Sequence, residues 1–346
     1  DAPSSGVGMS NRNHDLQPAG NASTAAPARR RMVAACALVT SATLVVATGI
    51  AGVHSAEATT PAPQPRSSST SMMVGTFNVH NGSSSLGNSR GRLDRIAAEI
   101  RRGAFEVVGI QEADTAMRDQ LTARLRPTYT YSLLGDARGI NMTGGLIFYR
   151  PDSLYAGQTQ GTVPLPTPSG PQRFALYQDF YHRSSGAHFL FVSVHLANGD
   201  GRAASDWRSV QARKMAIRIA EINKSALPVI IGGDMNSNRG AKYVYDAPRQ
   251  VLQANGFGEV FDRATARANA NFNSFNRLAR NPPKGGYRPD QIYVSGSIGV
   301  QYAETMVRIV VKKKRVGSKV KKVKLYRTPF VSDHNPIRSI VTIPGQ

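Results

Sequence analysis

Polar side chains that suit metal-assisted or acid–base chemistry follow several apolar, strand-like runs of this sequence. They occur in short motifs at residues 76–80, 109–113, 193–197, 230–237 and 331–336. Where several buried strands end in such groups, oxygen ligands for a hard divalent cation can converge with two imidazoles for proton transfer. That combination suits the hydrolysis of a phosphate ester. The candidate residues are Asn78, Glu112, His195, Asp234, Asn236, Asp290, Asp333 and His334.

The sharpest pair is Asp234 and Asn236, which follow the apolar run 228–231 and two glycines. Residues i and i+2 of an extended segment face the same side, so this carboxylate and this amide can contact one phosphate or one metal. An Asx turn that closes a strand would explain the same two residues. The presence of the other motifs favours the functional interpretation.

Both candidate imidazoles also end strand-like runs. His195 follows the run 189–194, and a structural histidine is the alternative interpretation. His334 is adjacent to Asp333, and neighbours on a strand point apart, so we expect metal or water contact for Asp333 and phosphate stabilisation or proton transfer for His334. Asp290 is expected to orient His334, because a carboxylate on one ring nitrogen fixes the tautomer of the other.

Glu112 ends the apolar run 107–111. A glutamate on a buried strand is costly unless it is paired or bound to a metal, so Glu112 is a candidate metal ligand. Asn78, in the first predicted strand, is expected to bridge metal and phosphate.

The charge of the chain favours a polyanionic partner. Its 346 residues include 43 Lys and Arg against 22 Asp and Glu, a formal net charge of +21. Such a field attracts polyanions, although solubility or adhesion to an anionic envelope would explain it equally. The segment 311–324 is predicted to form a basic hairpin that turns at Gly317-Ser318 and contacts a phosphate backbone through Lys312, Lys313 and Lys314. An edge hairpin that lysines protect against aggregation is the alternative.

A second candidate substrate contact is the loop 272–288, where aromatic and basic residues alternate. Such a loop can stack bases and hold phosphates, and Tyr287 and Arg288 are its candidate contacts. Aromatic side chains that only anchor a long loop are the alternative.

The N-terminal part, residues 1–58, has the pattern of a secretory signal. Three arginines at 29–31 precede the uncharged apolar stretch 32–53, and Ala56-Glu57-Ala58 resembles a cleavage site. An uncleaved membrane anchor formed by 32–53 is the alternative, and both interpretations place the rest outside the cytoplasm. We expect a linker at 59–71 and a catalytic domain at 72–346. The only cysteine is Cys36, so that domain has no disulfide.

Strands and helices alternate from residue 72 without strict βαβ regularity, which predicts an α+β sandwich of two sheets with outer helices. The expected helices are 92–101, 115–125, 203–222 and 247–254. The expected strands are 72–79, 107–111, 129–134, 145–149, 174–181, 188–195, 228–232, 291–294, 305–311, 320–326 and 337–343.

The order Asn, Glu, His, Asp-x-Asn, Asp, Asp-His resembles the endonuclease/exonuclease/phosphatase superfamily over residues 71–343. The resemblance implies a four-layered α/β sandwich, in which two mixed, mainly antiparallel β-sheets are flanked by helices. It also implies a phosphoesterase that uses Mg²⁺ or Mn²⁺, with Ca²⁺ as a further possibility. By analogy Glu112, helped by Asn78 and Asp333, would hold the metal.

The same analogy implies roles for the remaining candidates. Asp234 and Asn236 would position or activate the attacking water. His195 and His334 would serve as general acid or base and as stabiliser of phosphate charge, with Asp290 behind His334.

Within the superfamily, secreted pancreatic-type deoxyribonucleases are similar in layout. The segment 143–152 resembles their strand before the central hairpin, and Arg173 falls near a phosphate-binding arginine of that group. Those enzymes place a glutamate near the position of Thr143 to orient the first catalytic histidine, and their stabilising disulfide has no counterpart here.

The predicted function is a secreted, metal-dependent nuclease of low sequence specificity, with DNA or RNA as substrate and no obligate protein partner. One alternative is a phosphodiesterase or phosphatase for phospholipid, sphingomyelin or inositol phosphate, which would act on anionic lipid. Another is a non-catalytic surface protein that binds polyanions.

Overall fold

The computed structural model describes residues 68–81, 86–87, 89–132, 145–167, 172–237 and 246–345. All of them belong to one compact unit, Ala62–Gln346. The predicted signal region 1–58 and residues 59–67 of the predicted linker lie outside the described residues. No helix within the described ranges is long and apolar enough to cross a membrane, and the stretch 32–53 is not part of those ranges.

Seven strands of the described chain form a first sheet, in the order β10-β12-β15-β1-β2-β4-β3. At its centre β1 (Thr70–Asn78) pairs antiparallel with β15 (Ile337–Ile343) and parallel with β2 (Val107–Gln111). The first and last strands of the domain are therefore neighbours. The other strands are β3 (Thr130–Tyr131), β4 (Leu146–Tyr149), β10 (Ala266–Ala268) and β12 (Gly299–Thr305).

Six further strands of the described chain form a second sheet, in the order β5-β6-β7-β8-β11-β9. The predicted antiparallel pairing of the segments 174–181 and 188–195 is confirmed, because β6 and β7 are antiparallel neighbours. β8 then pairs parallel with β7 and antiparallel with β11. The strands are β5 (Leu154–Leu165), β6 (Arg173–His182), β7 (His188–His195), β8 (Val229–Asp234), β9 (Phe257–Glu259) and β11 (Asp290–Ser295).

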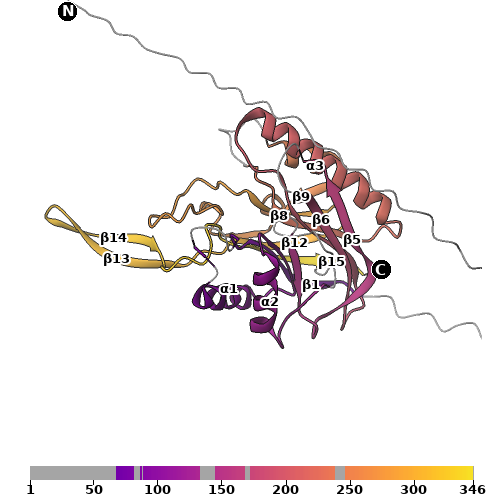
Figure 1. The fold of residues 1–346 in the computed structure, drawn as a ribbon, viewed down its shortest axis with the longest axis horizontal. Helices are drawn as coiled ribbons and strands as arrows, with labels where there is room; N and C mark the ends of the chain where they lie inside the picture. The colour runs from indigo at the N-terminus through magenta and orange to yellow at the C-terminus, as the bar shows by residue number, and fades with distance from the viewer. Residues whose placement is uncertain are drawn as a thin grey trace, which may run out of the picture. The chain divides into compact units, whose positions relative to one another are not determined.

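The two sheets pack face to face, and helices cover their outer faces (Figure 1). Strand alternation produces this arrangement: in β1, Val74 faces the core between the sheets, whereas Phe77 faces the core under α1 and α2. Met215 of α3 packs on Ile231 of the second sheet. The predicted four-layered sandwich is confirmed. The helices are α1 (Arg90–Gly103), α2 (Thr115–Leu125), α3 (Gly201–Ile222), α4 (Ala247–Ala254) and the short α5 (Val260–Arg263).

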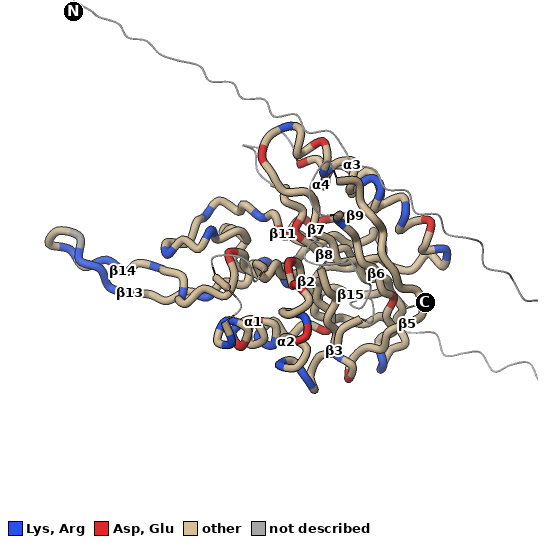
Figure 2. Tube along the Cα trace, in the orientation of Figure 1, with Lys and Arg blue, Asp and Glu red and all other residues tan. Residues whose placement is uncertain are grey.

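The predicted basic hairpin is present as a separate two-stranded antiparallel sheet of β13 (Ile309–Val316) and β14 (Lys319–Tyr326). It extends away from the two main sheets (Figure 1), and lysine and arginine gather in the half of the hairpin that lies next to its turn (Figure 2). Gly317 adopts a φ of 62° at the turn, a conformation that glycine reaches without a steric cost.

The predicted strands differ from the structure at several places. The short strands β9 and β10 were not predicted, and β1 begins at Thr70, inside the predicted linker 59–71. A continuous strand at 305–311 is wrong: β12 ends at Thr305, and the backbone N–H of Met306 donates to Pro336 O (2.8 Å), before β13 begins at Ile309. The 12-residue strand β5 was not predicted, because it lies at a sheet edge and most of its side chains are polar or exposed. Such an edge strand lacks the apolar signature of a buried one.

Candidate active site

The ends of neighbouring strands bring the candidate residues together. Asn78 is the last residue of β1, and His195 and Asp234 are the last residues of the parallel strands β7 and β8. Asp290 is the first residue of β11, which runs antiparallel to β8. The register therefore places His195 and Asp290 directly beside Asp234, one on each side.

A polar pocket of about 410 Å³ lies at these strand ends. Asn78 and Asp290 do not line it; they are buried behind it and contact residues that do. Four residues that were not among the candidates also contribute. The lining is His80, Asn81, Glu112, Arg173, His195, Asn198, Asp234, Asn236, Phe275, Asp333 and His334.

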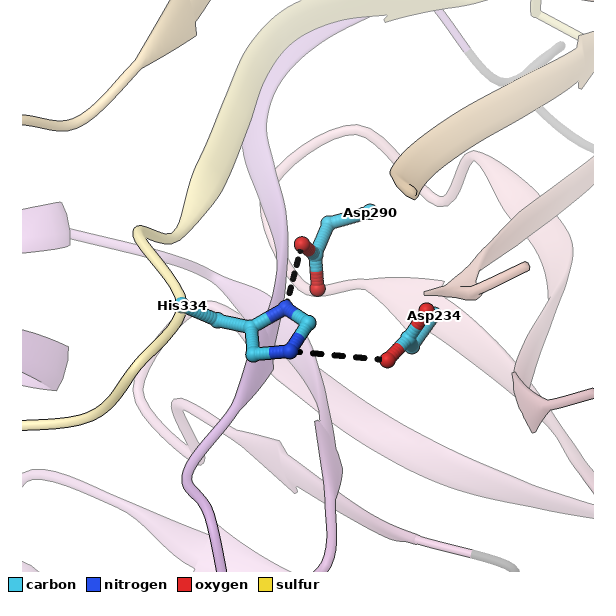
Figure 3. Close-up of side chains that lie close together, drawn as sticks. All are labelled: Asp234, Asp290 and His334. Atoms are coloured by element: carbon cyan, nitrogen blue, oxygen red, sulfur yellow. Dashed lines mark hydrogen bonds and ion pairs between the residues drawn. The ribbon is translucent and has the colours of Figure 1, made fainter. Parts of the chain in front are cut away.

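Asp234 contacts several of the other candidate residues, and Figure 3 shows its carboxylate close to the ring of His334. Its Oδ2 accepts a hydrogen bond from Asn78 Nδ2 (3.0 Å) and lies 3.5 Å from His195 Nε2 and 3.9 Å from His334 Nε2. Both imidazoles are attracted to the carboxylate, yet neither is held in a short hydrogen bond to it. Their Nε2 atoms can therefore engage a substrate oxygen beside Asp234.

Asn236 forms the Asx turn that the sequence offered as an alternative, and it also lines the pocket. Its backbone N–H donates to Asp234 Oδ1 (2.8 Å), and its φ of 46° is left-handed. Its side-chain Nδ2 donates to Leu196 O (3.0 Å), which ties the end of β8 to the end of β7. The turn thus fixes the orientation of the Asp234 carboxylate, so the structural and functional interpretations of this motif are compatible.

His334 is held as a cation by the carboxylate behind it. Its Nδ1 lies 2.7 Å from Asp290 Oδ2 (Figure 3). Burial lowers the pKa of His334, but the charge and hydrogen bond of Asp290, with the charges of Asp234 and Asp333, outweigh it and raise the pKa to about 10. His334 is therefore protonated at neutral pH, and its Nε2–H is available to a phosphate oxygen.

His195 is in the opposite protonation state. Complete burial lowers its pKa to about 3, because the attraction of Asp234 does not offset the loss of solvation and the repulsion of Arg173 and His334. Its Nδ1 is buried and has no hydrogen-bond partner among the described residues. Thr143, where related enzymes are expected to place an orienting glutamate, lies outside those residues.

Glu112 is fixed by two donors at the rim of the pocket. Its Oε1 accepts from Asn78 Nδ2 (2.9 Å) and its Oε2 from the backbone N–H of Asn81 (3.1 Å). Glu112 itself has a φ of 60°, and His80 has a φ of 59°. Left-handed backbone at bulky residues is costly and persists where the surrounding contacts enforce it, which is common at functional sites.

His80 is a pocket residue that the sequence reasoning missed. Its Nδ1 lies 3.1 Å from Asp333 Oδ1. Burial raises the pKa of Asp333, but the hydrogen bond from His80 and the charges of His334 and His80 bring it below its ordinary value. The sequence contains a pattern that could have identified His80. His80 follows Asn78 by two residues, as Asn236 follows Asp234, and residues at this spacing in an extended segment face the same side.

The donors at the rim suit the metal that the resemblance implies. Glu112 and Asp333 offer carboxylate oxygen, which Mg²⁺, Mn²⁺ and Ca²⁺ prefer. Asn78 directs its Nδ2 at Glu112, and its Oδ1 accepts from the backbone N–H of His80 (2.9 Å), so Asn78 orients Glu112 from behind the pocket. A second possible metal-binding group, formed by Asp234, Asp290 and His334, has ligand atoms within 4.8 Å of one another. There Nδ1 of His334 is already engaged by Asp290 Oδ2 (2.7 Å), and its Nε2 lies 3.9 Å from Asp234 Oδ2. The residues thus fit a hard cation near Glu112.

The predicted substrate contacts are only partly at the pocket. Arg173 lines it and donates from Nη1 to His195 O (3.4 Å). Tyr287 does not line it. Arg288 as a substrate contact is wrong: it is buried, its guanidinium lies 3.9 Å from the Phe261 ring centroid, and its Nη1 donates to Ala270 O (2.7 Å). Lys312, Lys313 and Lys314 lie on the hairpin, outside the pocket lining.

A buried arginine of α1 holds the loops that carry the pocket. The guanidinium of Arg92 donates to the carbonyl oxygens of Val79, His80 and Val331, and also to Gly87 O (2.7 Å). It therefore ties the loop that bears His80 to the segment that leads into Asp333.

Replacing Arg92 by Met should lower the free energy of unfolding by roughly 2–4 kcal/mol, because several buried carbonyls lose their donor. Urea unfolding followed by circular dichroism measures the change. Arg95→Met, on the same helix, is the matched control. An Arg92 variant as stable as the control would contradict the anchoring role.

The sequence matches the Endonuclease/Exonuclease/phosphatase family over residues 75–334, which is most of the chain, and the protein belongs to this family. Its members are hydrolases that act on phosphate esters and generally use a divalent metal. A search of curated proteins finds no match.

Solved structures similar to this one share the fold at low sequence identity. A family member from Bacteroides thetaiotaomicron has 21% identity and a TM-score of 0.62, over 80% of this chain and 96% of that chain. A mannosyl-6-phosphatase of Bacteroides thetaiotaomicron has 21% identity and a TM-score of 0.60, over 78% and 99%. D. rerio TDP2, complexed with a single-strand DNA product, has 17% identity and a TM-score of 0.54, over 79% and 99%.

Proposed function

We propose that this protein is an exported, metal-dependent phosphodiester hydrolase that acts as a nuclease with little sequence specificity. The observation that carries the proposal is the pair of imidazoles whose Nε2 atoms lie 3.5 Å (His195) and 3.9 Å (His334) from Asp234 Oδ2. Burial lowers the pKa of His195, whereas Asp290 raises the pKa of His334. One can accept a proton while the other stabilises phosphate charge. Nucleic acid as the substrate is supported by the net charge of +21, and export is supported by the signal pattern at 1–58.

In the proposed mechanism a scissile phosphate lies in the pocket beside Asp234. Asp234 and Asn236 position the attacking water, and neutral His195 takes its proton while Asp234 stabilises the imidazolium that forms. As the water oxygen bonds to phosphorus, the P–O bond to the leaving group breaks, and His334 donates from Nε2 to an oxygen of the reacting group. The leaving oxygen departs as an alcohol after it takes a proton from His334 or from solvent. Asp290 keeps His334 protonated through the hydrogen bond at Nδ1. Arg173 adds positive charge to the pocket wall.

A divalent metal fits the mechanism at Glu112, with Asp333 as a further oxygen donor. When bound, it supplies Lewis-acid stabilisation of the phosphate oxygens. Two N–H donors, from Asn78 and the backbone of Asn81, already fix the orientation of the Glu112 carboxylate.

Glu112→Gln should raise the Mg²⁺ concentration needed for half-maximal hydrolysis by at least about tenfold, because an anionic ligand is lost. A chelator should abolish the activity of the parent protein, and added Mg²⁺ should restore it. The Mg²⁺-dependent rise in Tm provides a readout without turnover and should also shift to higher Mg²⁺. The control is Glu221→Gln, an exposed residue of α3. Equal Mg²⁺ requirements in the two variants would exclude Glu112 as a ligand.

The proposal is tested by incubating supercoiled plasmid with the purified protein and Mg²⁺, beside a chelated sample and His195→Ala. Metal-dependent nicking that the variant loses would support a nuclease. A folded protein that leaves plasmid and RNA intact with Mg²⁺, Mn²⁺ and Ca²⁺, but hydrolyses inositol phosphates or phospholipid head groups, would overturn it.

A further inference from the structure

The hairpin of β13 and β14 carries an unbalanced charge. Residues 309–326 contain eight lysines and arginines and no aspartate or glutamate. Because directly opposed residues of two antiparallel strands lie on the same face, the register places four of these cations on each face of the hairpin. One face has Lys313, Arg315, Lys322 and Lys324, and the other has Lys312, Lys314, Lys319 and Lys321.

The pairing of the two strands makes this charge unfavourable for the stability of the hairpin. Lys313 lies directly opposite Lys322, and Lys314 opposite Lys321. Like charges in directly opposed positions destabilise a pair of strands, and an isolated two-stranded hairpin is only marginally stable. A lysine-protected edge needs charge on its outer side only, whereas this ribbon is positive on both faces. Its charge therefore fits a polyanion that surrounds it.

The base of the hairpin is fixed to the pocket. Tyr326, the last residue of β14, is buried, and its hydroxyl accepts a hydrogen bond from Nδ2 of Asn335, the residue after His334 (2.9 Å). At the start of β13, Arg308 Nε lies 2.8 Å from Glu99 Oε2 on α1. The ribbon therefore has a defined direction from the pocket.

Further cations lie between the hairpin and the pocket. Arg280 Nη1 donates to Thr328 Oγ1 (2.7 Å), just after β14. Exposed Arg277 lies 5.6 Å from the ring centroid of Phe275, which in turn lies 4.9 Å from the ring centroid of His334. Positive side chains thus continue from the ribbon to the site where a phosphate would be cleaved.

We propose that this ribbon enters the major groove of double-stranded DNA and aligns one strand with the pocket, an inference that rests on the proposed nuclease function. The major groove of B-DNA, about 12 Å wide, admits a two-stranded β-ribbon. Eight residues of extended strand reach about 26 Å, so cations on both faces meet phosphates along both walls.

The same geometry discriminates against other polyanions. The major groove of A-form RNA is deep and narrow, a single strand has no groove, and a flat bilayer contacts one face only. Val311 and Val320, which are 59% and 63% exposed, lie on the same face as Lys313. Exposed apolar side chains can contact the thymine methyl group in the major groove, a group that uracil lacks.

The test is binding of the full chain, in the presence of a chelator, to fluorescent duplex DNA, duplex RNA and single-stranded DNA of one sequence over a range of salt concentrations. The hairpin variant changes Lys313, Lys314, Lys321 and Lys322 to Gln. It should bind duplex DNA at least tenfold more weakly, and the slope of log K against log salt should fall by about 3.6 for four lost phosphate contacts. Binding to duplex RNA and single strands should change less.

Two controls separate the ribbon from general charge and from misfolding. Changing the exposed Arg202, Arg213, Lys214 and Lys224 to Gln removes the same charge from α3 and the turn after it, and should leave the salt slope unchanged. Changing the four hairpin lysines to Arg keeps the charge and should retain DNA binding. Equal losses in the two Gln variants would overturn the proposal.

The groove itself is tested with duplex DNA whose cytosines carry a glucosylated hydroxymethyl group at C5, which fills the major groove without altering the phosphates. The parent protein should bind it at least tenfold more weakly, whereas netropsin, a minor-groove ligand, should not compete. Unimpaired binding to the glucosylated duplex, or hairpin-dependent binding to anionic phosphatidylglycerol vesicles but not to DNA, would contradict the proposal.

Hydrolysis of bis(p-nitrophenyl) phosphate separates this inference from the proposed function. This small diester needs the pocket but not the ribbon, so the hairpin variant should hydrolyse it at the parent rate. If the diester is hydrolysed but the hairpin variant binds DNA as tightly as the parent protein, the inference fails and the phosphodiesterase function stands. If neither the diester nor plasmid is hydrolysed, the proposed function fails.

Discussion

Replacing Asp234 by Asn should lower the rate of phosphodiester hydrolysis by about 10³-fold, because proton transfer to His195 loses the carboxylate that positions the water and stabilises the imidazolium. The substitution keeps the size of the side chain but removes the charge shared by His195 and His334. In the parent protein Asn78 Nδ2 donates to Asp234 Oδ2, and the substitution places a second amide against that donor. The attacking water thus loses the carboxylate that positions it, and His334 loses one of its counter-charges.

The measurement is kcat/KM for a small diester and for plasmid, beside circular dichroism and Tm. Asp206→Asn, on the exposed surface of α3, is the control and should retain parent activity. An Asp234→Asn variant that keeps more than a tenth of the activity would exclude Asp234 from the reaction. Loss of activity together with loss of the folded spectrum would point instead to a structural role.

Replacing Asp290 by Asn should move the alkaline limit of activity from near pH 10 to below pH 7. Asp290 is the main cause of the raised pKa of His334, and without it burial lowers that pKa. His334 would then be neutral at pH 8 and could no longer stabilise phosphate charge as a cation. The loss at pH 8 should be about 10²-fold or more, with partial recovery at pH 6.

The pH profile of kcat/KM and the histidine resonances in NMR spectra test this shift together. Asp179→Asn is a close control, because Asp179 also pairs with a histidine, His188 (2.8 Å), but neither residue lines the pocket. A parallel decrease at every pH, with no shift of the profile, would show that Asp290 acts only by holding the fold.

The ion pair of Asp290 and His334 also makes the free energy of unfolding depend on pH. The pKa of His334 in the folded protein, about 10, exceeds its ordinary value of 6.5. The stabilisation from its protonation is therefore fully present below pH 6.5 and is lost as the pH rises toward 10. Asp290→Asn should remove most of this dependence.

Local patterns predicted the main features of the fold and the convergence of candidate residues. Apolar runs that end in Asp234 or His195 correspond to the ends of β8 and β7, because buried strands carry the clearest hydrophobic signal. The four-layered arrangement came from the resemblance, since periodicity alone does not give strand order. Strand β5 was missed because an exposed edge strand lacks that apolar signal.

The misassigned residues show where sequence patterns stop being informative. Arg288 belongs to a loop in which basic and aromatic residues alternate, but only tertiary structure shows that its guanidinium packs on Phe261. The protonation states of His195 and His334 also depend on tertiary contacts, because burial and the neighbouring charges set them. Similar sequence contexts thus gave one neutral and one cationic imidazole.

The central pairing of the first and last strands has a consequence for when the protein becomes active. Ser71 and Thr342 are in contact although they lie 271 positions apart in the sequence, and the pocket needs both Asn78 from β1 and His334 before β15. Contacts between such distant parts of a chain form slowly, because loop closure must precede them. The pocket therefore assembles only when the two ends of the domain have paired.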